Sequence, residues 1–156
     1  VEVGLGRRGR AEAGKRPSRA ARNHRAIYAR HPEVGAVLNA SPVNVTAFSV
    51  TSAPLDSRTI PESYLLLRDV ARVPYGVQFR DPEALAREVS LRAPIALLEN
   101  DGVLVLGANV LEAFDRLEVL ESTSEALVNS RPIGEVAPMS DEVIDDLKRA
   151  FASMLA

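Results

Sequence analysis

The sequence predicts an α/β fold of three layers, in which one mixed, largely antiparallel sheet lies between two layers of helices. Short apolar runs alternate along the chain with amphipathic runs, which is typical of a sheet covered by helices. Two apolar runs, 95–98 and 103–106, flank the turn sequence Asn100-Asp101-Gly102 and should pair as a buried hairpin. An apolar repeat at helical spacing begins at Val110 and predicts a helix of roughly twenty residues after the hairpin.

The remaining elements are predicted from local signals. Short apolar runs favour three more strands, at 1–5, 34–38 and 70–75. Capping residues and apolar spacing favour five more helices, over 19–30, 43–50, 60–67, 81–90 and 141–155. Residues 54–59 are expected to form a loop, and residues 132–138 a linker.

Three helix starts rest on a polar residue whose side chain can accept a backbone N–H. Ser18, Asp81 and Ser140 are the predicted N-caps of the first, fourth and last of these five helices. The apolar face of the long helix contains Val110, Phe114, Leu117, Leu120, Ser124, Leu127 and Val128. The apolar face of the last helix contains Val143, Ile144, Leu147, Phe151 and Leu155.

Composition limits the classes of protein and site. The 156 residues fit one domain, 1–156, and 46% apolar with 26% charged residues is typical of a globular protein. The lack of cysteine excludes disulfides, thiolate metal sites and cysteine nucleophiles, and fits the cytoplasm. No apolar run approaches the ~20 residues of a membrane helix, so no membrane contact is expected. Two histidines cannot form a zinc site of three imidazoles within one chain.

Charge is distributed unevenly along the chain. Residues 1–30 contain nine Arg or Lys residues against Glu2 and Glu12. A basic segment can bind nucleic acid or phosphate, although a solvated surface is the commoner explanation. This segment has no aromatic residue before Tyr28 to stack on bases, so nucleic-acid binding is not expected.

The two histidines are both interpreted structurally. His24 lies one turn before Tyr28 on the predicted buried side of the first helix, which indicates a packed and hydrogen-bonded core histidine. His31 stands just before Pro32 and is expected at the end of that helix, where a positive charge favours the helix dipole.

Three stretches carry a resemblance to a known family. Residues 15–28 contain Lys-Arg-Pro-Ser and then His24 with Ile27-Tyr28. Residues 31–49 contain His-Pro-Glu-Val-Gly-Ala-Val and later Ser-Pro, and residues 97–121 contain Leu-Leu-Glu-Asn-Asp-Gly-Val. In order and spacing these stretches resemble the class II aldolase/adducin family, and the resemblance extends over nearly the whole chain.

The resemblance implies a fold, an assembly and a chemistry. It implies a central sheet flanked by helices, a four-fold tetramer with sites between subunits, and the cleavage or rearrangement of sugar phosphates. In the family's aldolases three imidazoles hold zinc, which polarises the substrate carbonyl, and a nearby Glu moves the proton. The N-terminal part of the family fold, with its phosphate loop, is expected to be missing from this chain.

The functional positions of the family are replaced here. By register, Asn39 and Ser41 stand at two zinc-ligand positions, Asp101 at the third, and Ala20 at the position of the acid. Asn39, Ser41 and Asp101 remain polar and should converge, so they are the predicted catalytic cluster. Their oxygen atoms do not suit zinc, and Asp101 is only a weak candidate ligand for a hard cation such as Mg²⁺. No cofactor is therefore predicted, although the family resemblance alone implies zinc.

An anion site and a function complete the predictions. Ser18 and Arg19, at the start of the first helix, are predicted to bind an anion; a capped helix without a ligand is the alternative. The predicted function is that of a lyase acting on a small phosphorylated sugar or related carbonyl compound. The alternative is a non-catalytic scaffold or binding protein on the same fold, as in adducin. In either case a homo-oligomer, by resemblance a tetramer, is the expected assembly.

Overall fold

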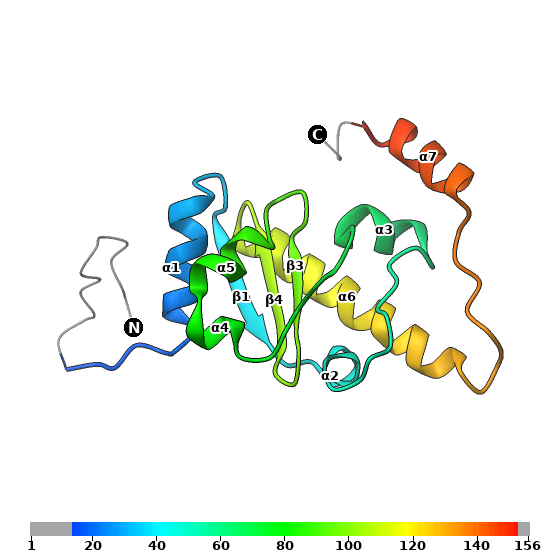
Figure 1. Cartoon of the computed structure of the whole chain (residues 1–156). Helices are drawn as coiled ribbons and strands as arrows, with labels where there is room; N and C mark the ends of the chain where they lie inside the picture. Colours follow the sequence, from blue (N-terminus) through cyan, green and yellow to red (C-terminus); the bar gives the residue numbers. More distant parts are fainter. Residues whose placement is uncertain (1–13, 153–156) are drawn as a thin grey trace.

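The central sheet has four strands in the order β1-β4-β3-β2, and Figure 1 labels β1, β4 and β3. The structure is a computed structural model, and it describes residues 14–152, so the predicted strand at 1–5 and Leu155 lie outside the described residues. The strands are β1 (Ala36–Ala40), β2 (Ala71–Val73), β3 (Ile95–Leu98) and β4 (Gly102–Gly107). β1 and β3 are antiparallel to β4, whereas β2 is parallel to β3. The predicted mixed, largely antiparallel sheet is confirmed.

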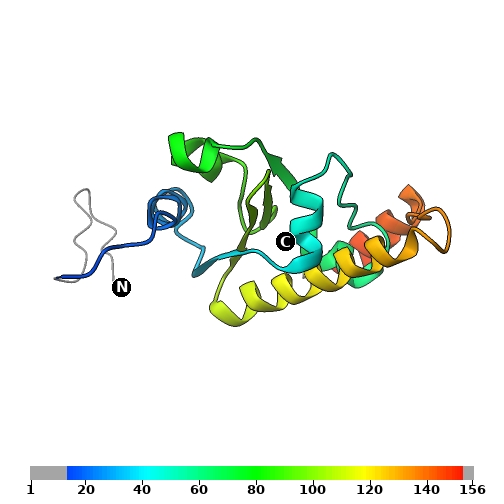
Figure 2. The same cartoon turned by 90° about the horizontal axis from the view of Figure 1, so that it is seen from below.

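Helices cover both faces of the sheet. One face is covered by α1 (Ala21–Arg30), α4 (Val77–Arg80) and α5 (Pro82–Arg87). The other face is covered by α2 (Val43–Ser49), α3 (Pro61–Leu67) and α6 (Val110–Ser130). Figure 2 shows α1 and α2 on opposite sides of the strands. The three-layer arrangement predicted from the sequence is therefore confirmed.

The hairpin of β3 and β4 forms the centre of both cores. Side chains alternate between the two faces of a strand, so Leu104 and Leu106 join the α1 side while Val103 and Val105 join the α6 side. Every residue of both strands is buried. Burial on two faces removes the need for polar residues, which is why the two runs are apolar without interruption.

Two elements near the N-terminus begin later than the sequence predicts. β1 extends to Ala40, because its pairing with β4 continues through polar Asn39 until Ala40 lies opposite Val103. α1 begins at Ala21, and Ala20 is its N-cap without a side-chain hydrogen bond. The prediction that Ser18 caps this helix is wrong. Ser18 instead forms a preceding turn, in which its Oγ accepts from the Ala20 N–H at 3.3 Å.

One short helix and one helix face differ from the prediction. α4 is not predicted from the sequence, and it follows Gly76, which has a φ of 92°. On α6, Val110, Phe114 and Val128 are exposed by 66%, 48% and 36%, although the sequence predicts all three on the buried face. The buried residues of α6 are Ala113, Leu120, Thr123, Ser124 and Leu127.

None of the helices in the described part of the chain is long and apolar enough to span a membrane.

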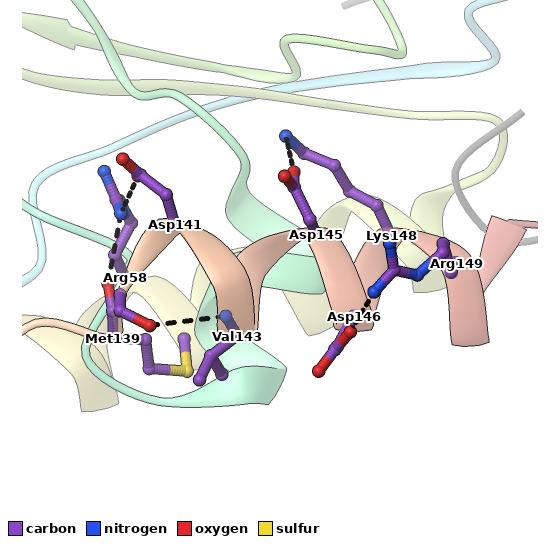
Figure 3. A network of polar contacts seen from close by, with 9 residues as sticks. Arg58, Met139, Asp141, Val143, Asp145, Asp146, Lys148 and Arg149 are labelled. Atoms are coloured by element: carbon purple, nitrogen blue, oxygen red, sulfur yellow. Dashed lines mark hydrogen bonds and ion pairs between the residues drawn. The ribbon is translucent and has the colours of Figure 1, made fainter.

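The last helix, α7 (Asp141–Ala150), is joined to the rest of the structure through Arg58 (Figure 3). Arg58 donates to the Met139 carbonyl at 3.0 Å and forms an ion pair of 2.6 Å with Asp141, and the Met139 N–H donates to the Arg58 carbonyl. Ser140 caps α7 as predicted, by accepting from the Val143 N–H. Only Ile144 of this helix is buried, so most of the predicted apolar face is partly exposed.

Candidate functional site

The three predicted catalytic residues line one small cavity at the end of the sheet. Antiparallel pairing places the end of β1 beside the β3–β4 turn, so Asn39 and Ser41 meet Asp101 although about sixty residues separate them in the chain. The cavity has a volume of about 220 Å³. Its other lining residues are Ala40, Leu98, Gly102 and Val103. The sequence therefore predicted the gathering of these side chains, while their catalytic role stays a prediction.

Gly102 makes the close approach of the two strand ends possible. A Cβ atom at this position would lie 2.4 Å from the Ala40 carbonyl oxygen and 2.8 Å from Ser41 Oγ. Both distances are far below van der Waals contact, so a side chain here would push the end of β1 away from the turn. The absence of a side chain at Gly102 thus allows Ser41 and Asp101 to lie close to each other across the cavity.

Asn39 is held from the α1 side by His24. His24 Nε2 lies 2.8 Å from Asn39 Oδ1, and the bond is accessible from the surface. His24 is half-buried, so the prediction of a core histidine is wrong in its burial and right in its hydrogen bonding. The partner is a predicted site residue rather than a core group, because α1 crosses the face of β1 from which Asn39 projects.

Asp101 is held by Gln78 of α4, a helix that covers the same face of the sheet as α1. Gln78 Nε2 donates to Asp101 Oδ2 at 3.1 Å, and Gln78 Oε1 accepts from the Gly76 N–H at 3.0 Å. Gln78 is only 4% exposed. Ser41 Oγ–H reaches the Asp101 main-chain carbonyl at 3.5 Å, which is a long hydrogen bond. The cavity therefore lies between two polar supports, His24 on α1 and Gln78 on α4.

Ser18 and Arg19 do not line this cavity. The Arg19 guanidinium lies over the Phe79 ring at 5.5 Å from its centroid, a cation–π contact, and Tyr75 packs edge-on against the same ring. Phe79 follows Gln78 in α4, so this contact joins the segment before α1 to the helix that supports Asp101. The predicted anion-binding role of Ser18 and Arg19 stays a prediction.

The donor set of the cavity does not fit the zinc that the family resemblance implies. It offers one carboxylate, one carboxamide and one hydroxyl, whereas zinc prefers imidazole and thiolate ligands. Residues 14–152 contain no group of three or more His, Cys, Asp or Glu side chains that could hold a metal ion. His31 is committed elsewhere, since its Nε2 lies 2.9 Å from the Ala86 carbonyl and its Nδ1 lies 3.5 Å from Glu33.

A larger cavity shares no lining residue with this site. It has a volume of about 430 Å³ beneath the linker that follows α6, and its floor includes Phe48 and Leu127. It contains none of the predicted site residues, and its lining is mainly apolar apart from Asp56, Arg131 and Glu135. We place the candidate site at the smaller cavity, because convergent polar side chains rather than volume provide chemistry.

Sequence reasoning missed the two supporting residues. His24 could have been found, because it lies one helical turn after Ala20, the register position of the family's acid. Gln78 gave no usable signal, because α4 has only four residues and no apolar period. Its position depends on the turn at Gly76, which brings α4 over the β3–β4 turn.

Known proteins resemble this chain in sequence. The sequence profile described as Class II Aldolase and Adducin N-terminal domain matches residues 1–128. An L-fuculose phosphate aldolase of Methanococcus vannielii is 30% identical over 102 residues, which are 65% of this chain and 55% of that protein. The corresponding protein of Methanococcus maripaludis is 26% identical over 116 residues, which are 72% of this chain and 61% of that protein. The chain thus matches a little over half the length of these relatives.

Solved structures share the fold. The crystal structure of YgbL from Escherichia coli has a TM-score of 0.77 and 26% identity, and the match covers 90% of this chain and 70% of that one. YgbL from Klebsiella pneumoniae gives a TM-score of 0.76 and 28% identity, with 93% and 71% covered. The match of the family profile to most of the sequence and the shared fold lead to one conclusion: this chain belongs to the class II aldolase and adducin family.

Proposed function

We propose that the chain is an aldehyde-lyase acting on a small phosphorylated sugar or related carbonyl compound, through a site whose metal ligands have been replaced. The similarity to L-fuculose phosphate aldolases supports the substrate class. The cavity lined by Asn39, Ser41 and Asp101 supports the site. The observation that carries the proposal is the buried carboxamide of Gln78, which is hydrogen-bonded at both ends and holds Asp101 at the cavity.

The polar groups of the cavity match the needs of aldol cleavage. In such a cleavage a base takes the proton of a hydroxyl group, the carbon–carbon bond breaks, and its electron pair moves onto the neighbouring carbonyl oxygen. The protonated base then gives the proton to the enediolate, at the carbon whose bond was broken. Asp101 is the carboxylate of the cavity and is assigned this proton transfer. Asn39 and Ser41 are assigned the hydrogen bonds to the carbonyl oxygen.

Retention of these groups is the physical argument against a site that has lost all function. Asn39, Ser41 and Asp101 are exposed, whereas Gln78 is buried, and its carboxamide would be costly to bury without the hydrogen bonds that it makes to Asp101 and Gly76. Three of the four replaced positions, Asn39, Ser41 and Asp101, are polar, and residues of two helices hold Asn39 and Asp101 in place.

The first test is an assay of L-fuculose 1-phosphate cleavage by the full chain, in which the release of triose phosphate is measured. Substituting Asp101→Asn keeps the hydrogen bond to Gln78 possible but removes the base, and should lower kcat by about 10² or more. Asp115→Asn, a change on the exposed side of α6, is the matched control and should leave kcat unchanged. Unchanged turnover in Asp101→Ala would contradict the assignment.

A non-catalytic scaffold or binding protein is the second candidate. The observation that favours it is the replacement of all four positions, Ala20, Asn39, Ser41 and Asp101, at which the family resemblance implies catalytic groups. This candidate predicts a stable oligomer without turnover of any sugar phosphate. In that case Asp101→Asn would change neither the assembly nor any activity.

A further inference from the structure

We propose that His24 is a positioning residue that turns the Asn39 carboxamide so that its N–H₂ group faces the cavity, and that this amide and the Ser41 hydroxyl polarise a carbonyl where zinc would act in the family. This inference rests on the proposed function for its catalytic consequence. The orientation of Asn39 itself can be tested without any activity.

The orientation follows from the hydrogen bond between the two side chains. Asn39 Oδ1 can only accept, so His24 must donate from Nε2–H across the 2.8 Å contact. The oxygen end of the carboxamide is thereby turned toward α1 and is occupied. The Nδ2 end, with two N–H donors, is left for the cavity that Asn39 lines.

Gln78 imposes the opposite polarity on the other wall. The Gly76 N–H requires an acceptor, which fixes Gln78 Oε1 on the Gly76 side and Nε2 on the Asp101 side. Nε2 then occupies Asp101 Oδ2 and leaves Oδ1 as an acceptor. One wall of the cavity therefore presents the Asn39 N–H donors and the Ser41 hydroxyl, whose bond to the Asp101 main-chain carbonyl is long, at 3.5 Å, and weak. The other wall presents a carboxylate oxygen.

This arrangement of donors explains how the site could polarise a carbonyl group without zinc. Hydrogen-bond donors fixed before reaction stabilise a developing oxyanion without reorganisation, and loss of one such donor typically lowers kcat by roughly 10² to 10³. A carboxamide that could rotate freely would present its oxygen to the oxyanion for part of the time. His24 removes that unproductive orientation.

The first experiment measures the tautomer of His24. The chain has only two histidines, so long-range ¹H–¹⁵N correlation spectra of histidine-labelled protein at mildly alkaline pH contain two ring patterns. His31 provides an internal reference, because its Nε2 faces the Ala86 carbonyl, which can only accept, and so must carry a proton. His31→Gln assigns the spectrum.

In the wild-type chain we expect His24 to show the same Nε2–H pattern as His31. In Asn39→Ala we expect the His24 ring to show a mixture of the two tautomers instead. An Nδ1–H pattern for His24 would overturn the proposal, because Asn39 would then be donating its N–H to the ring and not to the cavity. Either result stands whether or not the chain cleaves L-fuculose 1-phosphate.

The second experiment measures the consequence for turnover of L-fuculose 1-phosphate. His24→Ala should lower kcat by roughly 10- to 100-fold with a smaller change in KM, as loss of a supporting residue does. His24→Gln, which retains an N–H donor, should recover most of that loss, whereas His31→Gln should have no effect. Asn39→Asp keeps an acceptor for His24 but removes the N–H donors, and should be as inactive as Asn39→Ala.

The outcomes separate the two proposals. If the wild-type chain shows no turnover and His24 shows the Nε2–H pattern, the lyase proposal is refuted, whereas the positioning of Asn39 by His24 is supported. Turnover that His24→Ala leaves unchanged would refute the positioning role and retain the lyase. Stoichiometric zinc in the active protein, with turnover lost on chelation and restored by zinc, would overturn the assignment of Asn39 and Ser41 as the polarising groups.

Discussion

Gly102 shows how a single residue without a side chain sets the geometry of the candidate site. It pairs with Leu98 at the start of β4 and faces both the Ala40 carbonyl and Ser41 Oγ. Any side chain added at position 102 would clash with main-chain atoms of Ala40. Main-chain atoms cannot rotate out of the way as the end of a long side chain can.

We therefore expect Gly102→Ala to destabilise the chain by about 1–3 kcal/mol, the usual range for forcing extra atoms into a packed site. Urea unfolding should show a lower midpoint with an unchanged slope. Gly134→Ala is the matched control, because nothing lies within 4 Å of the position that its added methyl group would take, and its midpoint should not fall. Equal midpoints for the two variants would show that the end of β1 moves easily.

The residues of the site were predictable to different extents. Asn39, Ser41 and Asp101 could be located because the family resemblance supplies a register and because strand ends and a hairpin turn converge in such a sheet. Gln78 could not, because its role depends on how the chain turns at Gly76 after β2. His24 could be located one helical turn after Ala20, although spacing alone does not identify Asn39 as its partner.

At the scale of elements, α2 depends on a carboxylate from another helix. Its N-cap is Pro42, which offers no side-chain hydrogen bond. Glu121 of α6 instead accepts from the main-chain N–H groups of Asn44 and Val45, each at 3.0 Å, and from Asn44 Nδ2 at 2.8 Å. One negative charge thus satisfies two of the free N–H groups at the start of a helix.

Glu121→Ala should cost about 1–3 kcal/mol of unfolding free energy, because two partly buried N–H donors lose their acceptor. Hydrogen exchange should accelerate in α2 more than in β3 and β4. Glu125→Ala, one turn further along the exposed side of α6, should alter neither quantity beyond about 0.5 kcal/mol. A Glu121 variant with unchanged exchange in α2 would show that packing alone holds that helix.

Elements with strong local signals were predicted best. The β3–β4 hairpin and α6 combine apolar period, turn chemistry and length, and the type and position of these elements agree with the structure. The sequence places β1 two residues early, because its last residues are weak strand formers and only the ladder with β4 keeps them extended. The predicted buried face of α6 is wrong at Val110, Phe114 and Val128, because an apolar residue at helical spacing does not by itself show which surface covers it.

At the scale of the whole molecule, exposed apolar residues gather at the start of α6. Val110, Leu111 and Phe114 are exposed by 66%, 69% and 48% in the single chain. The family resemblance implies assembly, and we propose that copies of this chain associate through this face of α6.

Light scattering after size exclusion should give a multiple of the 16.8 kDa chain mass for the wild type. The double substitution Leu111→Lys with Phe114→Lys should reduce that mass, because charges in an apolar interface are costly to bury. Ile133→Lys is the control, since Ile133 is as apolar and as exposed but lies in the linker after α6. A wild-type chain of single mass would contradict the proposal.

The attachment of α7 has a consequence for how this protein can vary. The family profile ends at residue 128, and the residues from 132 to 138 that follow α6 are exposed. Arg58 holds the start of α7 and Ile144 is its buried residue, and neither belongs to the two cores around the sheet. Insertions or exchanges of sequence in this linker should therefore be tolerated, so that α7 can vary without changing the sheet that holds the site.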